Sequence, residues 1–452
     1  DQQWAFFPSV SGGWRVSEEA FWKVNPDLFS NLKIRASYGS LGNGNVSPYS
    51  FLELLSISTS GRVLNGLKNK YTSAPAVMPD GLTWETATTT DVGLDFGMLN
   101  NRLQFNGDYY IRKTTDMYTV GETLPDVFGA SSPKGNYADM TTKGWEITLT
   151  WRDQFTLAEK PFNYEIRGTL SDYISTIDRY NNQTGNLDDY YAGKRVGEIW
   201  GYVTEGLFKD QADIDSHADQ TLIQSSSKRI TYPGDVKIKD LNGDHVIDYG
   251  NNTVDDHGDK TVIGNALPRY AYSINLSGDW NNFFLSAFFQ GVGKQDWYPS
   301  SECIFWGQYN RPYNNMPTWH QGNYWTEDNT DAYLPRYAGY NASLKSTPQT
   351  RYLQNVAYIR LKNLQFGYTL PQPIVSKAKL QNVRVYISAE NLWCWSPLYK
   401  HTRDLDVTNI YGSDPDLTDA DMSSGLNGNR GSGDGNSYPQ MKSVSLGLSV
   451  TF

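Results

Sequence analysis

The last ten residues of the chain, 443–452, alternate between apolar and small or polar side chains and end on an aromatic residue. Successive side chains of a β-strand point to opposite faces, so this segment would form a strand with one apolar face. The apolar face would carry Val444, Leu446, Leu448, Val450 and Phe452, and the other face Ser445, Gly447, Ser449 and Thr451. An apolar face backed by a small, polar one is typical of a wall between lipid and water. The segment therefore predicts a membrane-spanning β-strand.

The same alternation recurs along the chain. It is clearest in segments 32–39, 91–98, 103–112, 145–152, 162–170 and 383–390. The arginines of these segments fall on the polar faces, where they would point into a watery lumen: Arg35, Arg112, Arg167 and Arg384. Segment 356–370 changes phase part of the way along, and a β-bulge near Asn363 would restore its alternation.

The connections between these segments alternate in length. The short ones are Asn100-Asn101, 153–161, Asn281-Asn282 and 371–381, and the long ones are 41–83, 113–137, 179–268, 298–352 and 397–440. Short turns at one rim and long loops at the other are typical of outer-membrane barrels, whose short turns face the periplasm. A soluble β-sandwich has no reason to keep this asymmetry.

Eleven strands are expected, at about 4–16, 31–40, 84–98, 102–115, 138–152, 162–178, 269–280, 283–297, 353–370, 382–396 and 441–452. Complete bacterial barrels have an even number of strands, so an odd count indicates part of a barrel. The chain also begins at Asp1, with no Met and no signal peptide. We therefore expect an all-β fold, the C-terminal portion of a transmembrane antiparallel β-barrel with long extracellular loops, in which Phe452 is the outer-membrane assembly signal.

Composition agrees with a barrel and excludes several other classes. The longest apolar run, 283–289, falls far short of the roughly 18 residues that a membrane helix needs. The net charge of -10 argues against a nucleic-acid partner, which requires a basic surface. Cys303 and Cys394 lie far apart in sequence, and two cysteines give neither a zinc spacing nor a disulfide framework. Aromatic residues make up 14% of the chain, an excess that suits the girdles of a barrel, surfaces that stack on sugars, or both.

Short motifs spread from one end of the chain to the other carry a family likeness. They are WAFFPSVSGGWR at 4–15, LKIRASYG at 32–39 with GN at 42–43, WE at 84–85, VGLDF at 92–96, GY at 201–202, GLF at 206–208, PGD at 233–235, FFQGVGK at 288–294, YIRLKNL at 358–364 and SAENL at 388–392. In this order they resemble the SusC/RagA family of TonB-dependent outer-membrane transporters.

The resemblance implies a barrel of 22 strands, of which this chain would supply about eleven. It also implies a plug domain and a TonB-contacting segment, both absent from this chain, and a SusD-like surface lipoprotein that closes over the extracellular mouth. The location would be the outer membrane of a Gram-negative, Bacteroidetes-type bacterium. The leading hypothesis is TonB-dependent import of oligosaccharides; the alternatives are import of oligopeptides and, from another class, a secreted all-β glycan-binding protein. A secreted protein would purify without detergent, whereas a barrel would not.

A candidate cation site lies in the longest loop, 179–268. Oxygen ligands at relative positions 1, 3, 5, 7 and 9 match a loop of the EF-hand type, which wraps Ca²⁺ or Mg²⁺. The ligands would be Asp240, Asn242, Asp244, the carbonyl of Val246, and Asp248. Two departures weaken the match: His245 stands where the turn prefers Gly, and Asn251 where a bidentate Glu would complete the shell. An acidic, turn-rich loop that holds no metal is the alternative.

The loop 298–352 is rich in aromatic residues. Such rings can stack on the apolar faces of sugars, and tyrosine hydroxyls can add hydrogen bonds. The candidate substrate-binding residues are Trp306, Tyr309, Tyr313, Trp319, Tyr324 and Trp325, with Tyr333, Tyr337 and Tyr340 in the same loop. The alternative is that these rings pack the loop itself or the interface with the lid.

The sequence predicts no catalytic residues. Its histidines lie in loops without the spacing of a metalloprotease motif or a nucleophile elbow. The acidic pairs Asp188-Asp189 and Asp255-Asp256 could imitate a glycosidase dyad, but adjacent carboxylates in acidic loops are usually solvated charge. We therefore expect a transporter and no enzyme.

Overall fold

The structure is a computed structural model. It describes residues 4–44, 55–73, 77, 81–121, 132–224, 230–299, 303–309, 315–338, 347–408, 410 and 440–452. Within these residues no helix is long and apolar enough to cross a membrane.

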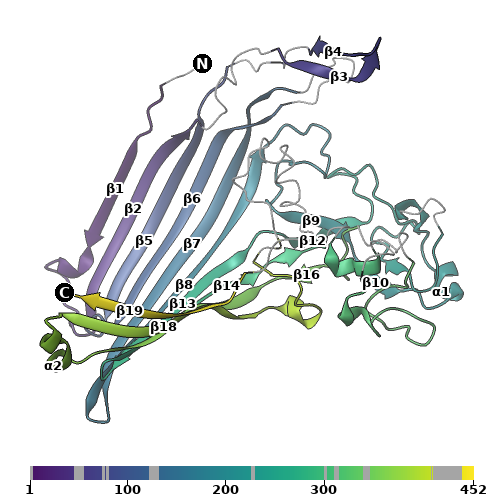
Figure 1. Cartoon of the computed structure of the whole chain (residues 1–452). Helices are drawn as coiled ribbons and strands as arrows, with labels where there is room; N and C mark the ends of the chain where they lie inside the picture. The colour runs from purple at the N-terminus through teal and green to yellow at the C-terminus, as the bar shows by residue number, and fades with distance from the viewer. Residues whose placement is uncertain are drawn as a thin grey trace.

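One antiparallel sheet of eleven strands dominates the molecule (Figure 1). Its strands are, in spatial order, β1 (Ser9–Arg15), β2 (Phe29–Asn43), β5 (Glu85–Met98), β6 (Leu103–Val120), β7 (Lys134–Leu157), β8 (Lys160–Arg179), β13 (Arg269–Trp280), β14 (Phe283–Lys294), β17 (Tyr358–Thr369), β18 (Asn382–Trp395) and β19 (Ser443–Thr451). The sheet curves like part of a barrel wall, with β1 and β19 at its two edges in the described part of the chain. All eleven expected strands are confirmed, in chain order.

Several strand limits differ from the prediction. The predicted loop 113–137 is shorter, because β6 continues to Val120 and β7 already begins at Lys134. The predicted turn 153–161 shrinks to Ala158 and Glu159, which both have positive φ (46° and 62°). Asn281 and Asn282 turn in the same way (48° and 70°). Two consecutive residues with positive φ form a two-residue hairpin turn whose twist matches that of the flanking strands. Both hairpins therefore have the two-residue loop that is the commonest hairpin connection.

The bulge predicted near Asn363 is present. The pairing of β17 with both neighbours shifts between Leu361 and Asn363. Lys362 is the additional residue opposite β14, whereas opposite β18 the additional residue is on β18, where Asn391 and Leu392 face Lys362. The shift lets the apolar residues on both sides of the bulge stay on one face of the sheet.

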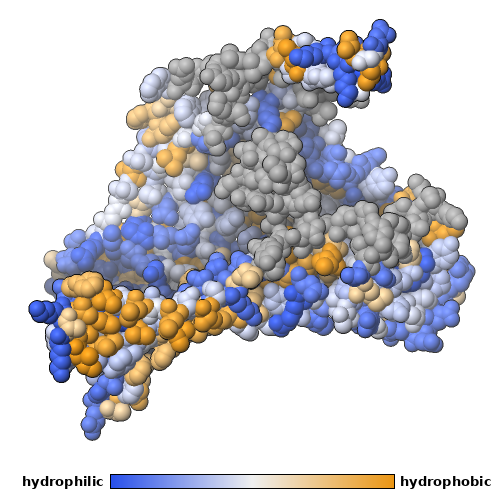
Figure 2. Space-filling view, in the orientation of Figure 1, coloured by the Kyte–Doolittle hydropathy of each residue, from blue (hydrophilic) through white to orange (hydrophobic). Residues whose placement is uncertain are grey.

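The two faces of the sheet carry opposite chemistry, which is visible in neighbouring cross-strand rows. Leu285, Phe366, Ile387 and Leu446 are aligned across β14, β17, β18 and β19, and each is about half exposed or more. The adjacent cross-strand row, one residue further along each strand, lies on the opposite face and consists of Ser286, Gln365, Ser388 and Ser445. Figure 2 shows hydrophobic residues gathered at the short-turn end, near β18 and β19. Soluble monomers rarely expose apolar rows that run across four strands, whereas a lipid-facing wall must.

Smaller elements lie in the connections. The two-stranded sheets pair β3 (Ile57–Leu64) with β4 (Leu67–Thr72), β9 (Glu198–Tyr202) with β12 (Lys260–Asn265), β10 (Thr204–Leu207) with β11 (Val236–Ile238), and β15 (Asp296–Trp297) with β16 (Gln354–Asn355). The short helices are α1 (Gln211–Asp215), α2 (Gln372–Val375), η1 (Val16–Glu18), η3 (Thr221–Ile223), η4 (Ile304–Tyr309), η5 (Thr318–His320), η7 (Ser376–Ala378) and η8 (Pro397–Lys400).

The buried core of the molecule lies in the long connections and not in the sheet. The described parts of 180–268, 295–357 and 396–410 fold together at the long-loop rim, and we call them the loop assembly (Figure 1). Its centre contains Tyr202, Trp297, Phe305, Leu334 and Tyr352, each at most 2% exposed. The long loops therefore form one packed body, while the sheet beneath them keeps its apolar face uncovered.

Candidate functional site

The polar face of the sheet is lined by fixed ion pairs. The Arg35 guanidinium on β2 reaches Asp95 on β5 at 2.8 Å and Asp108 on β6 at 2.7 Å. Asn106 donates a further hydrogen bond to Asp95. Arg35 thus joins three neighbouring strands through charge-assisted hydrogen bonds, which hold this part of the polar face in place.

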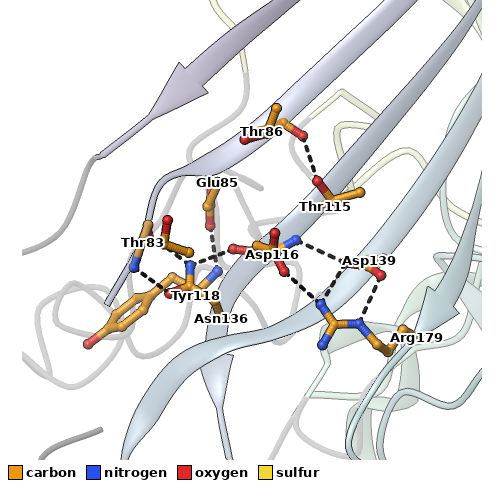
Figure 3. A network of polar contacts seen from close by, with 9 residues as sticks. All are labelled: Thr83, Glu85, Thr86, Thr115, Asp116, Tyr118, Asn136, Asp139 and Arg179. Atoms are coloured by element: carbon orange, nitrogen blue, oxygen red, sulfur yellow. Dashed lines mark hydrogen bonds and ion pairs between the residues drawn. The ribbon is translucent and has the colours of Figure 1, made fainter. Parts of the chain in front are cut away.

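A second polar network fixes the long-loop ends of β5 to β8 (Figure 3). The ladder between β6 and β7 is bulged at 114–117, and Asp116 has a φ of +56°. The displaced N–H groups of Asp116 and Tyr118 donate to the carboxylates of Asp139 and Glu85, at 2.9 and 2.7 Å. Arg179 then binds Asp139 at 2.8 Å and Asp116 at 3.0 Å. Side chains here replace the missing ladder bonds, so the strands stay joined where the loops begin.

The loop assembly contains the aromatic residues that the sequence singled out, and it buries two of them completely. Trp306 donates its indole N–H to the Pro299 carbonyl, and Tyr309 its hydroxyl to the Pro335 carbonyl at 2.6 Å. Both residues are 0% exposed. They pack the loop, so a ligand would reach them only if the assembly opened.

Trp319, Tyr324 and Trp325 are only partly buried, at the border of the same core. The indole N–H groups of Trp319 and Trp325 have no acceptor among the described residues. The predicted ligand contact therefore stays a prediction for these three residues. Tyr313 and Tyr340 lie outside the described residues.

The acidic loop folds back on its own backbone. Asp240 accepts the N–H groups of Gly243 and His245 at 2.6 and 2.9 Å, and these bonds hold its pKa below the ordinary value. Asp244 accepts from Val246, and Asp248 from Gly250, at 2.8 and 2.9 Å. Among the described residues, no group of three or more His, Cys, Asp or Glu side chains is arranged to hold a metal. The cation site at Asp240, Asn242, Asp244, Val246 and Asp248 stays a prediction.

Sequence reasoning missed a charged cleft between the upper end of β8 and the loop assembly. The cleft has a volume of about 580 Å³ and is lined by five charged residues: Arg195, Glu198, Arg269, Lys294 and Asp296. Arg269 is paired with Asp172 at 2.5 Å, and Lys294 lies 3.9 Å from Asp296. The lining residues lie between Tyr173 and Asp296 in the sequence, and no sequence pattern joins them. The cleft therefore offers ionic and polar contacts between the wall and the loop assembly.

A curved wall with one lipid-facing side, one polar side and a packed loop assembly at one rim defines a class, the outer-membrane β-barrel proteins. The chain belongs to the family described as TonB dependent receptor-like, beta-barrel, whose model matches residues 1–392. Membership confirms the resemblance found in the sequence and places the wall in the outer membrane. The long-loop rim is then extracellular and the short-turn rim periplasmic.

Curated relatives match along essentially the whole chain. The chain is 27% identical to the TonB-dependent receptor P26 and 29% identical to the receptor P3 of Formosa agariphila, which cover all of it. It is 24% identical to the TonB-dependent receptor SusC of Bacteroides thetaiotaomicron. The chain spans 43%, 42% and 40% of these three proteins, less than half of each. All three are named as TonB-dependent receptors.

A solved structure shares the fold. The structure of the RagAB peptide transporter superposes with a TM-score of 0.69 at 20% sequence identity, over 99% of this chain and 44% of that one. The RagAB peptide importer in an open state gives a TM-score of 0.68 at 19% identity.

Proposed function

We propose that the chain forms the C-terminal part of a TonB-dependent outer-membrane importer. The observation that carries this proposal is the division of one sheet into exposed apolar rows on one face and ion-paired polar residues on the other, beneath a folded extracellular loop assembly. In this proposal the complete importer also contains a plug domain, a TonB-contacting segment and a SusD-like lipoprotein that acts as a lid. The role of this chain is to form the wall and the mouth, and no bond of the cargo is made or broken.

Oligosaccharides are the cargo that we propose. Trp319, Tyr324 and Trp325 supply partly exposed rings at the border of the loop core. Aromatic rings suit sugars, because they can stack on the apolar C–H faces of a sugar ring. Oligopeptides are the second candidate, because the fold is shared with a structure titled as a peptide transporter.

A binding titration of the whole transporter with its lipoprotein tests both cargoes. Oligosaccharide and oligopeptide libraries are titrated against the native complex and against Trp325→Ala. We expect glycan binding, weakened on the order of tenfold in the variant, since the loss of one stacking side chain at a ligand site costs about 1–2 kcal/mol. Phe21→Ala, an exposed aromatic at the periplasmic rim, is the control. Binding of peptides alone would overturn the oligosaccharide proposal and leave the importer proposal standing.

A further inference from the structure

The lipid-facing side of the sheet is hollowed near its periplasmic rim. The hollow has a volume of about 710 Å³ and crosses β7, β8, β13, β14 and β17. Its walls are rings and aliphatic chains, among them Phe155, Phe162, Ile166, Trp280, Phe283 and Phe366. These strands lie in the middle of the sheet, so the hollow is bounded by paired strands on both sides.

One outward position in the hollow, Gly278, has no side chain. Gly278 shares the outward face with Leu276 and Trp280, and it lies between Tyr164 and Leu285 in the cross-strand register. A Cβ at this position would already touch the Phe162 ring at 3.2 Å. Its neighbours in the row are the large residues Tyr164 and Leu285, so the outward surface is lower at Gly278, and the Phe162 ring forms one wall there.

The rings at the periplasmic end of the hollow are held in place. The Trp280 indole donates to the carbonyl of Leu157 at 3.0 Å and so joins the β13–β14 hairpin to the β7–β8 hairpin. Phe283 stacks on Phe366, with ring planes 10° apart. Because these side chains are fixed, the hollow does not depend on a ligand to form.

A cation lies next to the hollow along β8, two residues before Phe162. Lys160 is the first residue of β8 and shares its outward face with Phe162. Its ammonium donates to the Asn281 side chain, between the two periplasmic turns. This is the level of the lipid phosphate groups in the periplasmic leaflet, where one Lys attracts a negative charge.

We propose that this hollow binds one glycerophospholipid of the periplasmic leaflet. An acyl chain lies over Gly278 among the rings, and the phosphate lies at Lys160. The apolar lining and the adjacent cation complement the two parts of such a lipid, and the surrounding apolar rows leave the hollow open only to the bilayer. The inference rests on the outer-membrane location and not on the cargo.

Native mass spectrometry of the whole protein, extracted in mild detergent, tests the site. We expect a species with one phospholipid, and a decrease on the order of tenfold in Gly278→Leu, which fills the groove that several methylene groups would occupy. The matched control is Gly168→Leu on the same face of β8, where a Cβ meets only the Ser273 carbonyl oxygen, at 4.0 Å. Lys160→Gln should decrease the bound fraction about fivefold, and Lys377→Gln, in the next periplasmic connection, should not.

A second measurement leaves Gly278 unchanged. Phospholipids with brominated chains quench nearby indoles, and the signal of Trp280 is the difference between the native protein and Trp280→Phe. We expect half-maximal quenching of Trp280 at a lipid-to-protein ratio about fivefold lower in the native protein than in Lys160→Gln. Equal lipid retention by Gly278→Leu and Gly168→Leu, or equal quenching curves for the native protein and Lys160→Gln, would overturn the proposal.

Discussion

At the scale of single residues, the loop assembly contains two buried polar side chains, His320 and Asp235, that are hydrogen-bonded within it. His320 is 0% exposed, with Nε2 bonded to the Phe305 carbonyl and Nδ1 to the Tyr337 hydroxyl, both at 2.9 Å. The carbonyl can only accept, so Nε2 carries the proton and Nδ1 accepts from Tyr337. Asp235, in the PGD motif, is likewise buried and receives Arg336 at 2.7 Å. Such groups stabilise one arrangement of the loops, because breaking their bonds leaves them unsatisfied.

The His320 ring predicts that acid loosens the loop assembly. Burial lowers the pKa of His320 from 6.5 to about 4, so the folded ring stays neutral where the unfolded ring takes up a proton. The contribution of His320 is complete above pH 6.5 and is lost as the pH falls toward 4, by about 3 kcal/mol in all. Hydrogen exchange of the loop assembly between pH 7 and 4 measures this loss. His320→Gln should remove this part of the pH dependence. His401 is present in both proteins and serves as the internal control. If protection against exchange falls with pH equally steeply in both proteins, the assignment to His320 is wrong.

The acidic loop offers a second test at this scale. The cation hypothesis predicts one Ca²⁺ site that involves Asp240, Asp244 and Asp248, with a dissociation constant on the order of 10⁻⁴ M, as in weak extracellular modules. Isothermal titration of chelator-treated protein measures it. Asp244→Asn should weaken binding at least tenfold, because one charged ligand is lost, whereas Asp210→Asn, on the exposed cap of α1, should not. A native protein that binds no Ca²⁺ would show that the backbone bonds alone hold the loop.

At the scale of elements, the strands were predictable and the loop assembly was not. The alternation in β19 and its neighbours arises because one face of the wall contacts lipid and the other contacts water. Each strand therefore shows the alternation in its own sequence. The burial of Trp306 and Tyr309 depends instead on partners that other loops bring, such as Tyr352 and Leu334. A local pattern carries no record of such contacts. The same reason explains why the charged cleft at Arg195 and Lys294 escaped notice.

The two faces of β19 give a prediction with a built-in control. Leu446 lies in the exposed apolar row with Ile387, and Ser445 in the polar row with Ser388. Leu446→Arg should destabilise the barrel by about 2–4 kcal/mol, the cost of a charge on the lipid face. Ser445→Arg on the lumen face should cost under about 1 kcal/mol, because water reaches it. Denaturant titration in lipid vesicles measures both; equal losses would mean that the faces are assigned wrongly.

At the scale of the whole molecule, the wall and the loop assembly are two kinds of structure in one chain. The wall has no core of its own, because its apolar residues face lipid, and its strands are joined by ladders and ion pairs. The loop assembly has a water-excluding core, like a small soluble domain. A change in one part can therefore leave the other folded, except where side chains join the two.

Arg360 is such a junction. It belongs to β17, is 4% exposed, and binds Asp406 of the loop assembly at 2.5 Å and Gln440, which precedes β19. Asp406 in turn accepts the N–H of Gln440 at 3.1 Å. One buried guanidinium thus holds the loop assembly, the wall and the approach to the last strand together.

Removal of this junction should release the loop assembly and spare the wall. Arg360→Met leaves the Asp406 carboxylate buried without its cation, which costs about 3–5 kcal/mol. We expect faster proteolysis of the extracellular loops in intact outer membranes, with an unchanged gel shift of the folded barrel on heating. Arg360→Met combined with Asp406→Leu should recover most of the protection, since a buried ion pair replaced on both sides by apolar groups is often neutral. If the double variant is cleaved as fast as Arg360→Met, the guanidinium acts through Gln440 and not through the ion pair.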